Sequence, residues 1–169
     1  MADAAADREW LHAGRVGRPH GLDGSFLVAD ANPALLRATE RLMINGVERV
    51  IERRAGHDAR LILRLEGCTD RDRAEAIRGQ ELLVARGQAP ALGEDEWWAE
   101  DLEGLAVCDG EREIGTVTRL LALPSCEVLE VERAQGGEPL LVPLVSDAVR
   151  TVDLERRLVD IDLGFLGEE

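Results

Sequence analysis

Apolar and polar residues alternate along much of the chain, with the period of two that is typical of a half-buried β-strand. The clearest run is residues 60–65, in which leucines at alternate positions share one face while Arg60, Ile62 and Arg64 share the other. Other short apolar segments bounded by turn residues predict further strands. They lie at residues 10–17, 25–30, 41–52, 80–86, 104–123, 127–145 and 156–163, and the longest of them contain a turn.

Turn residues divide the longer apolar segments into hairpins. Asn45 and Gly46 stand between two apolar runs, which is the strongest short-range signal for a tight hairpin. Asp109 with Gly110, and the two glycines at 136–137, occupy the same kind of position in the second half of the chain. Each pair predicts that the flanking strands run antiparallel.

Signals for helices are few and short. Asn32 is suited to cap a helix whose first turn holds Pro33. Thr69 is the predicted N-cap of a second, polar helix, and Gly79 is its predicted stop. Ser146 is the predicted cap of a single helical turn. The three segments are residues 32–39, 69–79 and 146–153.

The pattern predicts an all-β fold made of two small β-barrels joined by a short linker, with short helical insertions. Residues 87–96 are rich in Gly, Pro, Ala and acid and show no period, which is typical of a connection between domains. The predicted domains are residues 1–90 and 97–169, with the linker proper at 91–96.

Charge separates the two halves. Residues 1–90 carry 14 acidic and 14 arginine side chains, whereas residues 91–169 carry 20 acidic and six arginine side chains. The whole net charge of −14 therefore belongs to the second half. Such a surface repels a phosphate backbone, because nucleic-acid affinity depends on cationic groups. It favours a basic protein as the partner.

The glycine-rich stretch RVGRPHGLDGSF, residues 15–26, raises the question of phosphate binding. A phosphate loop needs a Lys followed by Ser or Thr after its last Gly, and this chain has no lysine. A dinucleotide site needs the spacing G-x-G-x-x-G, which the glycines at 17, 21 and 24 do not match. The stretch favours a turn between two strands, with a loop that contacts a ligand as the alternative.

No pattern of an enzyme, a metal site or a disulfide framework is present. The cysteines are odd in number and widely spaced, and the histidines do not form a ligand set. No serine lies in G-x-S-x-G, and Cys126 has no basic neighbour that would activate its thiol. We therefore expect no catalytic residue, no cofactor and no metal. The residues concerned are Cys68, Cys108, Cys126, His12, His20, His57, Ser25, Ser125 and Ser146.

The expected cellular location follows from the cysteine pattern and from the lack of a secretory signal and of a long apolar run. The cysteine pattern is typical of the reducing cytosol. The acidic opening MADAAADREW has neither the basic nor the apolar region of a secretory signal, and no apolar run approaches the roughly 18 residues that span a bilayer. We expect a cytoplasmic monomer that does not bind membranes.

Two adjacent tryptophans, Trp97 and Trp98, stand at the end of the linker in a chain with three Trp, two Phe and no Tyr. In an extended segment neighbouring side chains point to opposite faces, which would leave one indole available. One interpretation is an aromatic anchor for a protein partner, with nearby acids as its rim. The other is that both rings wedge between the two barrels.

Three segments together resemble the ribosome maturation factor RimM family over nearly the whole chain. Residues 14–28, GRVGRPHGLDGSFLV, are similar to the opening of that family's first barrel. Residues 109–117, 140–145 and 152–163 are similar, in order, to its PRC barrel. The linker motif matches at Glu96, Trp97, Trp98, Asp101, Leu102 and Gly104. The chain departs from the motif at Trp98, which replaces a tyrosine, and at Ala99 and Glu103.

The resemblance implies a non-enzymatic factor for late assembly of the head of the small (30S) ribosomal subunit, needed for efficient 16S rRNA processing. It implies binding to free 30S subunits and, through the PRC barrel, to a basic head protein, the nineteenth of that subunit. The partner interface would comprise Trp97, Trp98, Asp101, Leu102 and Gly104.

For the first barrel, the resemblance assigns Gly21 and Gly24 to a structural turn. Arg15, Arg18 and His20 are then candidates for contact with rRNA. Two rival interpretations remain: a PRC-barrel adaptor of a membrane-associated complex, which lipid binding would support, and an enzyme of unrecognised chemistry, which a bound flavin or metal would support.

Overall fold

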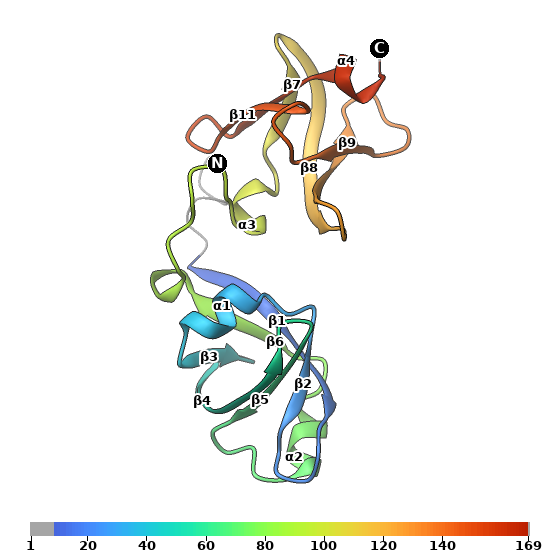
Figure 1. The fold of residues 1–169 in the computed structure, drawn as a ribbon. Coiled ribbons are helices and arrows are strands. Elements are labelled where there is room, and N and C mark those ends of the chain that lie inside the picture. Colours follow the sequence, from blue (N-terminus) through green and yellow to red (C-terminus); the bar gives the residue numbers. More distant parts are fainter. Residues whose placement is uncertain (1–8, 169) are drawn as a thin grey trace. The chain divides into compact units, whose positions relative to one another are not determined.

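The computed structural model describes residues 9–168 and consists mostly of β-strands (Figure 1). The described chain divides into two compact units, Glu9–Glu94 and a second that begins at Asp95. The all-β prediction with short helical insertions is therefore confirmed. Residues 1–8 lie outside the described residues. They belong to the predicted first domain and contain most of the acidic opening in which no secretory signal was expected. Glu169 also lies outside the described residues.

The first unit is a closed barrel with the strand order β1-β2-β5-β4-β3-β6. Every neighbouring pair is antiparallel, including the pairs β2–β5, β3–β6 and β1–β6, whose strands are not consecutive in the chain. Closure pairs β1 with β6, so the barrel has no free edge. The strands are β1 (Trp10–Pro19), β2 (Phe26–Ala29), β3 (Arg41–Ile44), β4 (Val47–His57), β5 (Arg60–Leu65) and β6 (Glu81–Ala85).

The barrel interior is filled by the apolar face that alternation predicted. On β5 the three leucines are buried and Arg60 is exposed. The predicted hairpin joins β3 to β4, and both Asn45 and Gly46 have positive φ, as the mirror-image hairpin turn requires. The largest fully buried side chains of the barrel are Phe26, Leu11, Leu35, Leu36, Leu42, Leu63, Leu65 and Leu82.

Short helices complete the first unit. The predicted cap of α1 (Pro33–Ala38) is confirmed, because the Asn32 side chain accepts the N–H of Leu35 at 3.3 Å. The predicted cap of α2 (Arg71–Ala76) is wrong by one residue. Asp70, not Thr69, accepts the N–H of Arg73, at 2.9 Å. A carboxylate is also favoured at a helix start by the helix dipole. A 3₁₀ turn, η1 (Arg86–Gln88), follows β6.

The second unit is a six-stranded sheet with the order β10-β9-β8-β7-β12-β11, curled into a half-barrel (Figure 1). Its pairs are antiparallel except β7 with β12, which run parallel. The strands are β7 (Ala106–Asp109), β8 (Arg112–Ala122), β9 (Glu127–Arg133), β10 (Leu140–Pro143), β11 (Val149–Asp153) and β12 (Leu158–Ile161).

Residues 146–153 depart from the prediction of a helical turn. The carbonyl of Val145 accepts the N–H groups of Ala148 and Val149, at 3.0 and 2.9 Å, and this single turn ends there. The chain then continues as β11, paired with β12. Two valines and a threonine favour a strand here, and pairing with β12 satisfies the backbone groups on that side of this edge strand.

The core of the second unit lies inside the curl of its sheet. Two one-turn helices adjoin it, α3 (Ala99–Leu102) and α4 (Leu163–Leu166), and each places a buried leucine in the core. The buried cluster comprises Leu102, Leu105, Val107, Ile114, Val117, Leu129, Val131, Leu140, Val142, Ala148, Val159, Ile161 and Leu163. Within residues 9–168, no helix has the length and apolarity that a membrane crossing needs.

Candidate interaction surfaces

The stretch that matched the glycine-and-histidine motif forms the end of β1, a loop and the start of β2. Arg15, Arg18 and His20 are all exposed. Strict alternation along a strand would turn Arg18 inward, but the register of β1 against β2 shifts between Val16 and Pro19. This irregularity places Pro19 inside and leaves Arg18 outside, so three candidate side chains become exposed within one short segment.

Ion pairs within the protein leave Arg15, Arg18 and His20 largely available to bind a ligand. The Arg15 guanidinium lies 4.0 Å from the Glu81 carboxylate, and both side chains are more than half exposed. Pairs of that kind contribute little, because water and salt screen them. Within the described residues Arg18 forms no ion pair, and the loop position of His20 is set by its backbone N–H, which donates to the Ser25 carbonyl at 2.8 Å.

The loop itself is closed by glycines and by one carboxylate. Gly21 and Gly24 both have positive φ, 73° and 85°. A Cβ at Gly21 would meet only Asp23 Oδ1 at 3.9 Å, whereas a Cβ at Gly24 would overlap the backbone of Cys68 and Asp70. Gly24 is therefore required by a close approach of two backbone segments, and Gly21 only by its conformation.

Asp23, in the β1–β2 loop, interacts with two arginines of neighbouring strands. This role was not predicted from the sequence. Its Oδ2 lies 2.9 Å from Arg53 and 3.4 Å from Arg64, and its Oδ1 accepts the Ser25 N–H at 3.1 Å. Arg53 and Arg64 are cross-strand partners on β4 and β5. Like charges directly opposite each other destabilise a sheet, and the Asp23 carboxylate compensates for both.

The same contacts change the acidity of Asp23. Hydrogen bonds from Ser25, chiefly, and then the hydrogen bond and charge of Arg53 lower the Asp23 pKa to about 2. The carboxylate is ionised at every pH near neutrality. The sequence indicated only that both arginines would face solvent, since Arg64 falls at an outward position of one predicted strand and Arg53 directly follows another. The register of β4 against β5, which places the two arginines opposite each other, could not be predicted from the sequence.

The tryptophan segment lies at the start of the second unit. Trp98 has extended backbone, with φ −74° and ψ 142°, and stands at the N-cap of α3. The chain turns directly after Trp98, because the Trp98 carbonyl accepts the Asp101 N–H at 3.0 Å and closes a helical turn. Ala, Glu and Leu in this turn are good helix formers.

Burial differs along the predicted interface. Trp98 is 9% exposed, Asp101 7% and Leu102 0%, whereas Gly104 is exposed. Trp97 is partly buried and packs against the core of the second unit. Of the aromatic pair, Trp97 thus retains more accessible surface.

Gly104 ties this segment to the sheet. Its N–H donates to the Val117 carbonyl on β8 at 2.8 Å, and its own carbonyl accepts from Arg157 Nη2 at 3.1 Å. Gly104 has φ 80°, so glycine is favoured there. The backbone around α3 is therefore held rigidly on β8.

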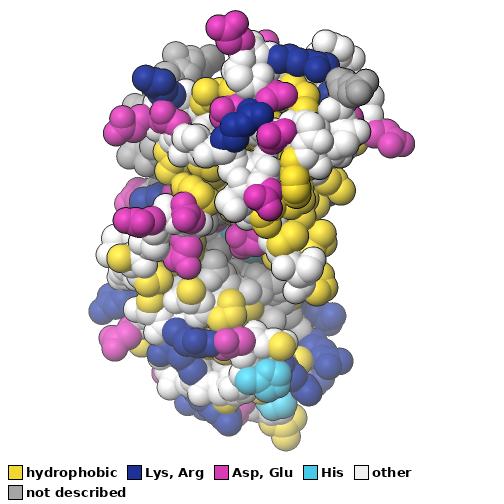
Figure 2. Space-filling model, turned by 45° about the horizontal axis from the view of Figure 1, so that its top comes forward, with side chains coloured by type: hydrophobic (Ala, Val, Ile, Leu, Met, Phe, Trp, Pro, Cys, Tyr) yellow, Lys and Arg dark blue, Asp and Glu magenta, His cyan; other side chains and the backbone are white. Residues whose placement is uncertain are grey.

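Acidic side chains dominate the second unit. Figure 2 shows them on that unit together with exposed hydrophobic side chains, while arginine and histidine side chains are prominent on the first. Arg150 compensates for three of the acids, lying 2.8 Å from Asp109, 3.1 Å from Asp160 and 3.2 Å from Asp162. A backbone hydrogen bond from Phe165, chiefly, and the charge of Arg150 lower the Asp162 pKa.

The edge strand β10 exposes an apolar side chain. Leu141 is 51% exposed and pairs across the sheet with Glu130. Val145, two residues beyond the strand, is 39% exposed. No strand pairs with the outer side of β10 within the described sheet, so its backbone groups there remain open to a partner.

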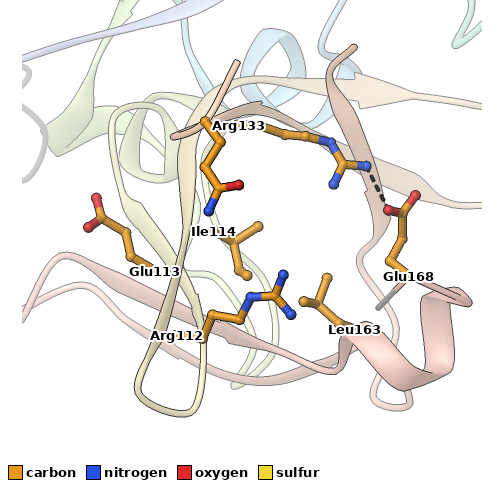
Figure 3. A pocket seen from close by; sticks show the side chains of 7 residues that line it. Arg112, Glu113, Ile114, Arg133, Leu163 and Glu168 are labelled. Atoms are coloured by element: carbon orange, nitrogen blue, oxygen red, sulfur yellow. Dashed lines mark ion pairs between the residues drawn. The ribbon is translucent and has the colours of Figure 1, made fainter. Parts of the chain in front are cut away.

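A small cavity of about 60 Å³ lies in the second unit, beside the starts of β8 and α4 and the end of β9 (Figure 3). Arg112, Ile114 and Leu163 border it, and Arg133 pairs with Glu168 at 3.0 Å across one side. Its size suits a few waters rather than a cofactor. The part of the chain that the structure describes also contains no cluster of three or more groups suited to hold a metal ion.

The fold is that of a two-domain protein, in which a closed barrel with a glycine-rich loop is followed by an acidic, curled sheet. Family models match both domains. The RimM N-terminal domain model matches residues 11–89, and the RimM PRC barrel domain model matches residues 99–164. A ribosome maturation factor RimM from Sorangium cellulosum (strain So ce56) is 37% identical over 164 residues, which are 92% of this chain and 95% of the relative. The chain belongs to the ribosome maturation factor RimM family.

Other relatives carry the same family name. A ribosome maturation factor RimM from Kocuria rhizophila is 43% identical over 102 residues, 59% of this chain and 53% of that protein. A crystal structure of a putative 16S ribosomal RNA processing protein RimM from Pseudomonas aeruginosa is 23% identical, with 90% and 96% of the two chains covered and a TM-score of 0.43. The solution structure of the N-terminal domain of RimM from Thermus thermophilus is 30% identical, covers 50% and 98%, and has a TM-score of 0.44.

Proposed function

We propose that this protein is a non-enzymatic, cytoplasmic factor for late assembly of the small ribosomal subunit, acting on the head region and promoting 16S rRNA processing. The observation that carries the proposal is the match of both domains, in order, to the RimM family. We assign the domains to residues 1–90 and 97–169, with the linker at 91–96, and propose that the protein acts as a monomer without a cofactor.

The second domain is proposed to bind the basic nineteenth protein of the small subunit. Its excess of acid supports this assignment, because a negative surface attracts a basic partner and accelerates its association. The proposed interface comprises Trp97, Trp98, Asp101, Leu102 and Gly104. In this interface Trp97 would contact the partner, while the buried Trp98, Asp101 and Leu102 would hold the segment in shape.

The first barrel is proposed to contact rRNA through Arg15, Arg18 and His20. Their shared exposure next to the β1 irregularity supports this, since arginine forms bidentate hydrogen bonds with phosphate. The barrel is close to charge-balanced, so such contact would be local rather than driven by a broad positive field.

Sedimentation of cell lysate tests the proposal. We expect the protein with free 30S subunits and not with complete ribosomes, because an assembly factor leaves once its site is filled. Deletion of the gene should raise the amount of unprocessed 16S precursor. Equal association with both particles, together with normal processing in the deletion strain, would contradict an assembly role.

A further inference from the structure

A second cavity, of about 260 Å³, lies in the first unit between strands β4 and β5 and helix α2. None of the residues that line it belongs to the β1–β2 loop, although Cys68 contacts Gly24 of that loop. Its apolar lining comes from Leu65, Cys68, Ala76 and Ile77, and two guanidinium groups, Arg49 and Arg73, stand beside them. The cavity thus combines an apolar floor with two cations.

Both arginines are fixed by the turn that connects β5 to α2. Arg49 Nη1 donates to the Glu66 carbonyl at 3.0 Å, and Arg73 Nη1 donates to the Gly67 carbonyl at 2.9 Å. Gly67 leaves room for this arrangement, because a Cβ there would lie 3.0 Å from Arg49 Nη1. Two guanidinium groups from different elements are therefore positioned by consecutive carbonyls.

The charge of these arginines is only partly compensated. Arg73 Nε lies 3.6 Å from Asp70, an exposed pair that water screens. Within the described residues Arg49 forms no ion pair, and its Nε is buried without a hydrogen-bond acceptor. A guanidinium group without a carboxylate partner keeps its positive charge, which an anionic ligand in the cavity would neutralise.

Cys68 contributes an apolar wall rather than a reactive group. Burial raises the pKa of its thiol, although the charges of Arg49 and Arg73 act in the opposite direction. A neutral thiol is a small hydrophobic surface. The pocket therefore suits a ligand with a flat, weakly polar body and an attached anion.

We propose that this pocket binds one nucleotide of single-stranded RNA, with its phosphate on Arg49 and Arg73 and its base against the accessible apolar surface of Ala76 and Ile77. Guanidinium groups bind phosphate through two parallel hydrogen bonds, and unstacked RNA bases also stack on the planes of arginine guanidinium groups. The assignment of ribosomal RNA as the source rests on the proposed function. Binding of a nucleotide by the pocket does not.

NMR titration of the full-length, ¹⁵N-labelled protein tests the pocket. The probe is adenosine 5′-monophosphate, compared with inorganic phosphate and with adenosine at the same concentrations. We expect saturable shifts of the amide signals of Gly67, Cys68 and Ile77 with the nucleotide, and much weaker binding of either part alone. Equal binding of inorganic phosphate, or no saturable shift at these residues, would overturn the proposal.

Variants separate binding from folding. Arg73→Gln and Arg49→Gln should each weaken nucleotide binding by about tenfold, the effect of losing a charge-assisted contact. Ala76→Leu keeps both arginines and fills the cavity, so it should abolish binding even if Arg49→Gln fails to fold. Arg60→Gln, an exposed arginine outside the pocket on β5, is the matched control and should bind as the wild type does. Unchanged binding in Ala76→Leu would overturn the proposal.

The pocket proposal and the proposed assembly role can be contradicted independently of each other. If the wild-type protein binds 30S subunits but no nucleotide, the pocket proposal is wrong and the proposed function stands. If it binds the nucleotide but no subunits, the pocket stands and ribosomal RNA is not its source. We expect Ala76→Leu to weaken, without eliminating, binding to 30S subunits.

Discussion

The backbone of Gly24 passes so close to the carbonyl oxygen of Cys68 that a Cβ at position 24 would lie well inside 3.0 Å of it. The contact joins the β1–β2 loop to the turn before α2, 44 residues further along the chain. Because Cys68 is itself buried, neither segment has room to move apart without disturbing the barrel. This contact ties the proposed rRNA-binding loop to the turn that holds Arg49 and Arg73.

The first prediction compares two glycines of that loop. Gly24→Ala should lower the free energy of unfolding by about 3 kcal/mol, since it combines a strained positive φ with backbone overlap. Gly21→Ala is the control, because it has a similar φ but open space, and should cost about 1 kcal/mol. Denaturant unfolding measures both. Equal losses would mean that the close approach to Cys68 is unimportant.

The second prediction concerns the acid dependence of Asp23. Its pKa is lowered in the folded protein to about 2 from 3.8, so ionised Asp23 stabilises the fold at all pH values above 3.8. That contribution should decline as pH falls from about 4 to about 2, through protonation of the folded carboxyl. NMR titration of the Asp23 carboxyl should give a midpoint near 2.

A variant isolates this effect. Asp23→Asn should be less stable than the wild type at pH 7, and the difference between the two should shrink as pH falls toward 2. Asp58→Asn is a suitable control, because the ion pair that Asp58 forms among the described residues is an exposed one with Arg37. A difference between wild type and Asp23→Asn that does not change with pH would contradict the role assigned to the Asp23 charge.

The third prediction separates the two tryptophans. Trp98→Ala should lower the free energy of unfolding by about 3 kcal/mol, as expected for a buried aromatic residue. Trp97→Ala should weaken binding to 30S subunits by about 2 kcal/mol with a smaller effect on melting, if Trp97 is the anchor. The measurements are subunit affinity and thermal melting of each variant and of the double variant.

Phe165→Ala provides the control for Trp97, because Phe165 is a 53% exposed aromatic residue outside the proposed interface. It should change neither affinity nor melting by much. A well-folded Trp97→Ala variant with wild-type affinity would eliminate the anchor. The partner surface would then be sought on the acidic strands of the second unit, beginning at the open edge of β10.

The fourth prediction concerns salt. The rate at which the protein associates with the purified nineteenth protein of the small subunit should fall steeply as salt rises, because the Debye length shortens from about 30 Å at 0.01 M to about 8 Å at 0.15 M. Stopped-flow fluorescence measures this rate. A rate independent of salt would show that the acidic surface serves solubility alone.

Charge variants localise the effect. Glu132→Gln with Glu138→Gln removes two exposed acids near β9 and should reduce the slope of rate against salt. Glu40→Gln with Asp72→Asn removes two exposed acids from the first unit and should leave the slope nearly unchanged. Equal effects of the two double variants would assign the attraction to net charge rather than to the second unit.

Local signals along the chain determined much of the fold. The Asn45-Gly46 hairpin, the Asn32 cap and the alternating leucines of β5 all form as predicted, because each depends on a few consecutive residues whose backbone preferences and burial agree. The motifs also indicated the family and the order of its two domains, which the family models confirm.

Predictions failed where neighbouring signals compete or where the partner is distant. At α2 two residues could cap, and Asp70 does so instead of Thr69. After Ser146 a local helical signal yields to β11, because pairing with β12 provides backbone hydrogen bonds along one side of the strand. At Trp97 and Trp98 the adjacency was visible, but which ring is more buried depends on how α3 is fixed to β8 through Gly104.

The sequence by itself determined most of the strands, their turns and the acidic second half, whereas the exposure of Arg18 depended on the irregular register of β1 against β2. Only the tertiary structure decided which charges meet. Asp23 lies between Arg53 and Arg64 because the register of β4 against β5 places the two arginines opposite each other. Arg49 and Arg73 share one pocket because both donate to consecutive carbonyls of the turn between β5 and α2. No local pattern encodes a distance between residues that are far apart in the chain.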